Sequence, residues 1–409
     1  MMKQTEQTEQ TIQTEQTCPA GGSTRDLDAE YVAHTYARFP LEIVRGQGSL
    51  VWDETGKEYI DLGTGIAVNT FGVADPEWAA AVSAQLNAVA HMSNLYYTGP
   101  CAKLAAELCR RTGMKKVFFG NSGAEANECA IKVARKYAAE RKGPEYNVIL
   151  TLNNSFHGRT LTTLAATGQE KFHALFRPLT PGFVHAAAND LAEAEALVKE
   201  HKVAGILFEC VQGEGGVLPL EGDYIRGLAE LAAREDILLM VDEVQTGNGR
   251  TGALYSYMNF GITPDVVTTA KGLGGGLPLG ACLMGAKAEH VLGPGDHGST
   301  FGGNPAACAG ALNVLSRIDD ALLAGVREKS ALIRETLEGA PGVKAVSGLG
   351  LMLGVQTVRP AGDVVRACME RGVLCLTAKD RVRLLPALNI PEDLLRKAVG
   401  ILREACAEA

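Results

Sequence analysis

Residues 242–245 (Asp-Glu-Val-Gln) and residues 270–276 (Ala-Lys-Gly-Leu-Gly-Gly-Gly) are the stretches that decide the predicted fold. Each follows a short aliphatic run, DILLMV at 236–241 and DVVTT at 265–269, and such runs are typical of buried strands. Open α/β sheets bind their ligands at the carboxyl ends of their strands. We therefore expect Asp242 and Lys271 to lie in one pocket.

Each of these two residues also has an ordinary interpretation. A lysine before a glycine run is commonly a solvated loop residue, and an aspartate after a strand is often a cap or a turn former. As a pair they match the needs of pyridoxal phosphate, which bonds to a lysine as a Schiff base and requires an acid facing its pyridine nitrogen. The rest of the chain has to decide between these interpretations.

Length and composition indicate a globular enzyme. The chain has 409 residues, enough for two domains, and its 46% hydrophobic and 21% charged residues are ordinary for a soluble protein. A net charge of -8 without any block of lysine or arginine argues against nucleic acid or an acidic membrane surface as a partner. No apolar run approaches the roughly twenty residues that span a membrane.

The cysteines and histidines form no metal-binding pattern. The ten cysteines include no C-x-x-C pair and the eight histidines no H-E-x-x-H motif, so we predict no metal site. Scattered free thiols suit a reducing compartment, and we expect a cytoplasmic protein.

The order of the predicted elements indicates an α/β fold with two domains. Strands and helices alternate between residues 148 and 241, which is typical of a mostly parallel sheet with helices on both faces. We expect a disordered Gln/Thr/Glu tail at 1–24, a segment at 25–75 that packs with the small domain, a large domain at 76–319 and a smaller α+β domain at 320–409. Helices are expected at 26–38, 76–91, 100–111, 191–200, 224–234 and 305–318, with one more that ends at about 141 and a last one that begins at 391. Strands are expected at 116–119, 148–152, 184–186, 205–211, 236–241, 265–269 and 279–285, and hairpins at 49–61 and 343–356.

The turn at residues 120–128 (GNSGAEANE) is a predicted anion site. It joins a strand to a helix, and its small residues leave backbone N–H groups free at the positive end of that helix. Ser122 and Glu125 match a capping box. The backbone at Gly123 and Ala124 is a candidate for holding a phosphate, although an ordinary capped helix has the same pattern.

A second glycine motif suggests a different cofactor. Residues 247–252 (GNGRTG) match G-x-G-x-x-G after a strand, so a dinucleotide site is formally possible. The context argues against it, because the charges of Asp242 and Glu243 would repel a pyrophosphate and no full helix follows the motif. No G-x-x-x-x-G-K-[ST] loop is present.

Taken together, the motifs resemble the class III (subgroup II) aminotransferases, which are fold-type I pyridoxal-phosphate enzymes. The resemblance covers nearly the whole chain from about residue 30 and is closest to the acetylornithine branch. It implies a large domain with a mostly parallel sheet and a smaller α+β domain. The stretches that carry it are 46–48 (GQG), 51–53 (VWD), 65–72 (GIAVNTFG), 93–97 (SNLYY), 121–128 (NSGAEANE), 155–160 (SFHGRT), 212–216 (QGEGG), 242–245 (DEVQ), Lys271, 297–305 (HGSTFGGNP) and 383–386 (RLLP).

The resemblance implies roles around the cofactor ring. Lys271 would carry the cofactor and then move the proton at the reacting carbon, and Asp242 would keep the pyridine nitrogen protonated. Gln245 would face the ring hydroxyl, and Val244 and Phe156 would lie on opposite faces of the ring. The neighbouring Glu243 has a structural ion pair as its ordinary interpretation.

The resemblance also implies how the phosphate is held. Ser122, Gly123 and Ala124 would bind it from the same subunit. Thr300 corresponds to a ligand that comes from the partner subunit. The expected assembly is therefore a homodimer with two shared sites.

Substrate contacts follow from the same resemblance. Arg159 would bind the substrate α-carboxylate through a bidentate contact, with Ser299 as a further substrate residue. Arg383 and Glu214 would form a switch, paired while the amino donor is bound and separated when a carboxylate of 2-oxoglutarate binds Arg383.

The expected reaction is transfer of the δ-amino group of N2-acetylornithine to 2-oxoglutarate. Succinylornithine, ornithine, succinyl-diaminopimelate and 4-aminobutyrate remain alternative donors. An aminomutase, which needs no external acceptor, a nicotinamide oxidoreductase and a non-enzymatic binding protein remain alternatives of a different class.

Overall fold

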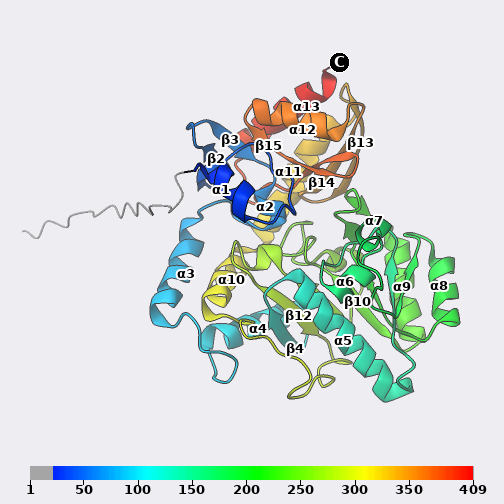
Figure 1. Cartoon of the computed structure of the whole chain (residues 1–409). Coiled ribbons are helices and arrows are strands. Elements are labelled where there is room, and N and C mark those ends of the chain that lie inside the picture. The colour runs from blue at the N-terminus through cyan, green and yellow to red at the C-terminus, as the bar shows by residue number, and fades with distance from the viewer. Residues whose placement is uncertain (1–21, 409) are drawn as a thin grey trace, which may run out of the picture.

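The computed structural model describes residues 22–408, in which a large α/β domain adjoins a smaller α+β domain (Figure 1). Most of the predicted tail at 1–24 lies outside the described residues. Its last residues begin helix α1 (Thr24–Tyr31), where the Ser23 hydroxyl accepts a hydrogen bond from the Asp26 N–H. No helix within residues 22–408 is long and apolar enough to cross a membrane.

Seven strands form the central sheet of the large domain, in the order β4-β12-β11-β10-β7-β5-β6. Among these strands β12 alone runs antiparallel to its neighbours, so the predicted mostly parallel sheet is confirmed. The strands are β4 (Lys116–Gly120), β5 (Val148–Leu152), β6 (Phe183–Ala186), β7 (Val203–Phe208), β10 (Leu238–Asp242), β11 (Val266–Thr269) and β12 (Gly280–Met284).

Helices cover both faces of this sheet. In β10, Leu238 and Met240 pack into the core beneath α5, whereas Leu239 and Val241 pack into the core on the other face. A strand buried on both faces has no need for polar alternation, which explains its continuous aliphatic run. The helices of this domain are α3 (Pro76–Ala88), α4 (Gly99–Thr112), α5 (Gly123–Lys142), α6 (Leu161–Ala166), α7 (Glu170–His173), α8 (Leu191–Glu200), α9 (Gly222–Arg234) and α10 (Pro305–Arg317).

The smaller domain is built on a second sheet, with strand order β13-β14-β17-β16 and antiparallel pairing. Leu353, Val382 and Leu395 belong to its buried core. Its elements are β13 (Val343–Leu349), β14 (Met352–Thr357), β16 (Leu376–Ala378), β17 (Arg381–Leu384), α11 (Asp320–Leu337), α12 (Ala361–Glu370) and α13 (Glu392–Ala407).

The N-terminal segment lies against this smaller domain (Figure 1). Strands β1 (Ile43–Gln47), β2 (Leu50–Asp53) and β3 (Glu58–Asp61) form a sheet whose fourth strand is β15 (Val373–Leu374). Strand β3 pairs with β15 in parallel, with Ile60 opposite Val373. Leu62 then lies in the same core as the C-terminal helices, so the two ends of the chain share one hydrophobic core.

Several predicted boundaries are wrong. The helix expected at 26–38 ends at Tyr31, ahead of a β-branched residue, Val32, in an extended conformation. The strand expected from Asp236 begins at Leu238, because Asp236 has a φ of 48°. The strand expected at 205–211 is interrupted: β7 ends at Phe208, and the short β8 (Val211–Gln212) pairs with β9 (Leu218–Pro219). The interruption contains Glu209, whose side chain enters the site described next.

Candidate active site

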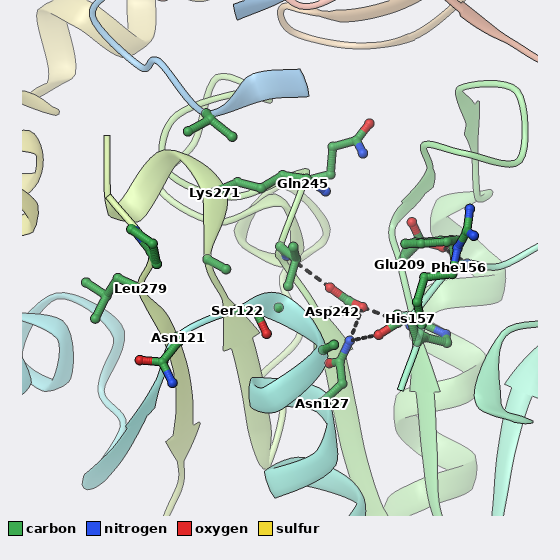
Figure 2. Close-up of a pocket in the computed structure, with 18 of the residues that line it drawn as sticks. Asn121, Ser122, Asn127, Phe156, His157, Glu209, Asp242, Gln245, Lys271 and Leu279 are labelled. Carbon is green, nitrogen blue, oxygen red and sulfur yellow. Dashed lines mark hydrogen bonds and ion pairs between the residues drawn. The ribbon is translucent and has the colours of Figure 1, made fainter. Parts of the chain in front are cut away.

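The carboxyl ends of the central strands border a cavity of about 490 Å³ (Figure 2). Strand β10 delivers Asp242 to this cavity, and Lys271 follows β11, so the two residues expected to meet do so. The N-terminus of α5 closes another side. The lining residues are Val68, Asn121, Ser122, Gly123, Ala124, Asn127, Phe156, His157, Gly158, Arg159, Glu209, Asp242, Val244, Gln245, Ala270, Lys271, Gly276, Leu277, Pro278 and Leu279.

Lys271 begins the short 3-10 helix η2 (Lys271–Leu273) with a φ of 44°. This left-handed conformation is costly for a residue with a side chain, and such strain is found mainly at functional sites. Burial lowers the pKa of the Lys271 ammonium, and the negative charges of Glu214 and Asp242 oppose that effect. A lowered pKa increases the fraction of neutral amine, which is the nucleophilic and basic form.

Asp242 is 3% exposed and is fixed by three hydrogen bonds (Figure 2). Its Oδ2 accepts from Asn127 Nδ2 at 2.7 Å and is 2.8 Å from His157 Nδ1, and its Oδ1 accepts from the Val244 N–H at 3.0 Å. Asn127 is itself held by the Thr268 hydroxyl at 2.7 Å. The carboxylate therefore presents a fixed edge to the cavity.

Glu243 points away from the cavity and has a structural role. Its carboxylate accepts hydrogen bonds from the hydroxyls of Thr246 and Ser256, each at 2.6 Å, and from the Tyr257 N–H at 2.9 Å. No cation in the described part of the chain pairs with it. The expected structural interpretation is right in kind, but neutral donors replace the expected ion pair.

The first turn of α5 forms an anion cradle beside Asp242. The N–H groups of Gly123 and Ala124 begin the helix and have no partner within it. A Cβ on Gly123 would lie 2.6 Å from Val244 Cγ1, so only glycine fits here. Only one of the two hydrogen bonds of the predicted capping box forms: the Ser122 hydroxyl accepts from the Glu125 N–H at 3.2 Å. The Glu125 carboxylate accepts from the Asn121 N–H instead of the Ser122 N–H.

These residues fit pyridoxal phosphate. The cavity combines a lysine of lowered pKa, a fixed carboxylate and a helix N-terminus that would hold the phosphate. Phe156 and Val244 both line the cavity, as their predicted places on the two faces of the ring require. Gln245 lines the same cavity as Lys271 (Figure 2).

Glu209 is a buried carboxylate that forms no salt bridge with another residue in the range 22–408. Its Oε2 accepts from the Phe156 N–H at 2.9 Å and its Oε1 from the Gly213 N–H at 3.4 Å, so it links the two loops that follow β5 and β7. Burial raises the pKa of Glu209 to about 7, with Asp242 adding to the rise and His157 opposing it. Glu209 therefore titrates close to neutral pH.

Arg383 and Glu214 form an ion pair that contacts Gln245 and lies outside the lining of the cavity. Arg383, in β17 of the smaller domain, is 3% exposed, and its Nη1 donates to Glu214 Oε1 and, at 3.2 Å, to Gln245 Oε1. Burial raises the pKa of Glu214, but the attraction of Arg383 outweighs it and the net pKa is lowered. The pair borders the cavity through Gln245 and does not line it.

Arg159 lines the cavity with an exposed side chain. Its guanidinium carbon lies 4.2 Å from the centre of the Phe172 ring and 5.7 Å from that of Phe156. No hydrogen bond or ion pair within residues 22–408 occupies this guanidinium. The two arginines expected to bind carboxylates are thus both near the cavity but are held differently.

Ser299 and Thr300 lie outside the cavity of their own chain. They line a separate surface hollow together with Ser93, Asn94 and Leu95. Ser299 is connected to the cavity by a 3.2 Å hydrogen bond from Asn121 Nδ2, whereas Thr300 is exposed. The predicted role of Thr300 in the partner's site stays a prediction.

Asn127, His157 and Glu209 are the cavity residues that sequence reasoning missed. Asn127 lies within the segment 120–128 that was predicted as the phosphate turn, and His157 lies between the predicted residues Phe156 and Arg159. These positions within the motifs were the available signal. Their side-chain direction depends on how three separate segments meet, which local patterns do not encode.

Comparisons with known proteins agree with this geometry. A family model described as aminotransferase class-III matches residues 31–406. An acetylornithine aminotransferase of Haemophilus ducreyi is 49% identical over 94% of this chain and 98% of the relative. A succinylornithine transaminase of Yersinia enterocolitica is 44% identical over 94% of this chain and 98% of the relative.

Solved structures are similar over the same extent. An ornithine aminotransferase of Toxoplasma gondii has a TM-score of 0.89 at 32% identity, covers 94% of this chain and 93% of its own, and is described as having partial occupancy of pyridoxal phosphate at its active site. The N-acetylornithine aminotransferase of Stenotrophomonas maltophilia has a TM-score of 0.80 at 34% identity and covers 93% of this chain and 98% of its own. The family of the predicted resemblance is confirmed, and its enzymes use pyridoxal phosphate. The chain belongs to the class-III aminotransferases.

Proposed function

We propose that this aminotransferase uses pyridoxal phosphate to move the δ-amino group of N2-acetylornithine to 2-oxoglutarate, giving N-acetylglutamate 5-semialdehyde and glutamate. The observation that carries the proposal is the meeting of Lys271, Asp242 and the N-terminus of α5 in one cavity. The identity of 49% to an acetylornithine aminotransferase supports the choice of donor.

Pyridoxal phosphate, when bound, supplies an electron-withdrawing ring that makes the C–H bond beside the amine acidic. Lys271 is the residue that would hold it covalently, and its amine of lowered pKa is suited to remove and return the proton at the amine-bearing carbon. Asp242 would face the ring nitrogen and stabilise the proton there. Asn127 and His157 keep the Asp242 carboxylate in place while this happens.

The arginines account for the use of two substrates in one cavity. Arg159 would bind, through its free N–H groups, the carboxylate that each substrate holds away from its reacting carbon: the α-carboxylate of N2-acetylornithine and the distal carboxylate of 2-oxoglutarate. While the Arg383–Glu214 pair is closed, the charge of Arg383 is neutralised, which suits the reacting end of the donor because that end has no carboxylate. Rotation of Glu214 would release Arg383 for the α-carboxylate of 2-oxoglutarate, which adjoins the reacting carbon and has no counterpart in the donor. The two half-reactions can therefore alternate without a change of enzyme.

The proposal includes a homodimer in the cytoplasm. Thr300 is exposed and lies outside its own cavity, which suits a residue that completes the phosphate site of a second copy. The partners are then a second subunit and small molecules. Mixing a Lys271→Ala chain with a Thr300→Ala chain tests the assembly, because a dimer that shares residues would regain one intact site.

A second donor has support of its own. Succinylornithine transaminases of two further Yersinia strains are 45% identical to this chain, close to the acetylornithine enzymes. Both donors have an acylated α-amine and a free δ-amine, and they differ in a distal carboxylate on the acyl group. Ornithine, succinyl-diaminopimelate and 4-aminobutyrate differ more in the groups that Arg159 and Arg383 would meet.

The visible spectrum of the purified protein tests the proposal first. We expect a yellow absorbance band that N2-acetylornithine abolishes and 2-oxoglutarate restores. A band that responds only to succinylornithine or another amine would replace the donor and keep the cofactor. Colourless protein that stays colourless with added pyridoxal phosphate would contradict the assignment of Lys271, and a spectral response to NADH alone would favour an oxidoreductase.

Two further outcomes separate the remaining alternatives. Product formation without 2-oxoglutarate would favour an aminomutase. A stable yellow band with no turnover of any amine would favour a binding protein. Lys271→Ala is the control, since it removes the residue that would carry the cofactor.

A further inference from the structure

Phe172 lies at the centre of an aromatic and cationic cluster beside the cavity. Its ring meets that of Phe156 edge to face, with centres 5.9 Å apart and planes at 73°. The Arg159 guanidinium lies over the same ring at 4.2 Å, and Lys171 Nζ lies 4.7 Å from it. Phe172 therefore touches both the aromatic residue proposed for the cofactor ring and the arginine proposed for the carboxylate.

The position of Phe172 is tied to the loop that carries Phe156 and Arg159. Just before helix α7, Gln169 Nε2 donates to the Ser155 carbonyl at 3.0 Å, and the Gly168 N–H donates to the Ser155 hydroxyl at 3.0 Å. At the other end of α7, His173 Nε2 lies 2.7 Å from the Thr167 carbonyl and 2.9 Å from that of Leu164. These contacts hold the Phe172 ring and the loop in one arrangement.

An aromatic ring holds an arginine in a different way than a carboxylate does. A cation over an aromatic face is attracted by the ring quadrupole, and this contact uses none of its N–H groups as hydrogen-bond donors. Arg159 has no hydrogen bond or ion pair in the described part of the chain, so all its donors remain available to a ligand. The ring fixes the direction of the guanidinium and leaves its fork open for a bidentate contact.

We infer that Phe172 is a positioning residue for Arg159, and that its ring sets the affinity for the substrate α-carboxylate by holding the guanidinium over the cavity with every N–H donor free. The inference rests on the proposed function for the identity of the substrate. It concerns a residue outside the lining of the cavity. Lys171, on the same ring, adds positive charge without a place in the cavity.

The test compares an acid with its amide. N-acetylnorvaline has the acetyl group and the α-carboxylate of the proposed donor and no δ-amine, so its binding can be measured by calorimetry without turnover. N-acetylnorvalinamide is the same molecule without the charge. We expect Phe172→Leu to weaken binding of the acid about threefold to thirtyfold, the range of a cation–π contact, and to leave binding of the amide unchanged.

Three further variants make the result specific. Phe172→Tyr keeps a ring and should restore binding to within about twofold of the wild type. Phe176→Leu changes a 58% exposed phenylalanine of the same segment and should have no effect. In an Arg159→Leu background, Phe172→Leu should cause no further loss for the acid. In turnover, Phe172→Leu should raise KM for the donor and leave kcat near the wild-type value.

The inference is wrong if Phe172→Leu weakens the acid and the amide equally, if it weakens neither, or if its effect adds in full to that of Arg159→Leu. If Phe172→Leu fails to fold, Phe172→Met, which also removes the ring but keeps a bulky apolar side chain, takes its place with the same expected loss of binding for the acid alone. If the wild type binds no N-acetylnorvaline but its absorbance responds to another amino donor, the proposed donor is wrong. The acid and amide of that donor without its reacting amine then decide the role of Phe172.

Discussion

The two arginines beside the cavity are held in opposite ways. Arg383 is buried, lies in β17 of the smaller domain, and is paired with Glu214. Arg159 is exposed and rests on aromatic rings with its donors free. The difference teaches that one arginine is ready for a carboxylate of either substrate, whereas the other is available only after an internal carboxylate leaves it. One cavity can thereby treat a shared group and a variable group separately.

The largest effect is expected at Lys271, which would react with the substrates that the two arginines bind. Lys271→Ala should lower turnover by a factor of about 1,000 or more, because it removes the general base and the covalent attachment point. Calorimetry with N-acetylnorvaline should show carboxylate binding within a few-fold of the wild type. Loss of carboxylate binding in this variant would contradict the division between the reacting centre and the arginines.

Removing each arginine in turn tests the comparison directly. Arg159→Leu should raise KM for donor and acceptor alike, whereas Arg383→Leu should raise it for 2-oxoglutarate alone. Loss of the charge contact between an arginine and a carboxylate predicts a change of about 100-fold. The measurement is the rate of each half-reaction by stopped-flow absorbance as a function of substrate concentration. Equal effects of both variants on both substrates would mean that the arginines are not specialised.

Freeing Arg383 should have a smaller effect. Glu214→Gln removes the competing negative charge while keeping a side chain of similar size. We expect binding of 2-oxoglutarate to strengthen about tenfold, and discrimination against dicarboxylate donors to fall. Half-reaction kinetics with N2-acetylornithine and glutamate as competing donors measure this. Unchanged kinetics with both substrates in Glu214→Gln or Glu214→Ala would show that no switch operates.

The smallest effect is expected for the thermal stability of the protein, and it concerns the carboxylates of Glu214 and Glu209. Pairing with Arg383 lowers the pKa of Glu214, whereas burial raises that of Glu209 to about 7. A raised pKa means that the stabilising contribution of Glu209 is present below its unfolded pKa and is lost as pH rises through about 7. Glu209→Gln should therefore gain a few degrees in Tm relative to the wild type at about pH 8, and less at about pH 5. A difference in Tm that is the same at both pH values would contradict this.

The sequence predicted the central sheet and the reacting pair because both depend on local patterns. Aliphatic runs located β5, β10 and β11, and the polar residues after two of them located Asp242 and Lys271. Strand direction was not predictable in this way. Nothing in the run at 280–284 distinguishes the antiparallel β12 from its parallel neighbours.

Other parts of the site required the three-dimensional structure. Asn127 and His157 meet at Asp242 from two different segments, and their role follows from that convergence. Glu209 enters the site because a strand is interrupted, and Phe172 supports Arg159 from a separate short helix. Arg383 and Glu214 were predicted by family resemblance, since 169 residues separate them along the chain.

The pairing of β3 with β15 has a consequence for the order of folding. Ile60 reaches its strand partner Val373 only after most of the chain has been synthesised, and the core around Leu62 is completed by the last helices. Contacts between distant parts of a chain are slow to form because the closure of a long loop is entropically costly. During translation the β15 edge of strand β3 and the apolar residues beside it must therefore wait for their C-terminal partners while the large domain forms, and in this interval the nascent enzyme is exposed to aggregation.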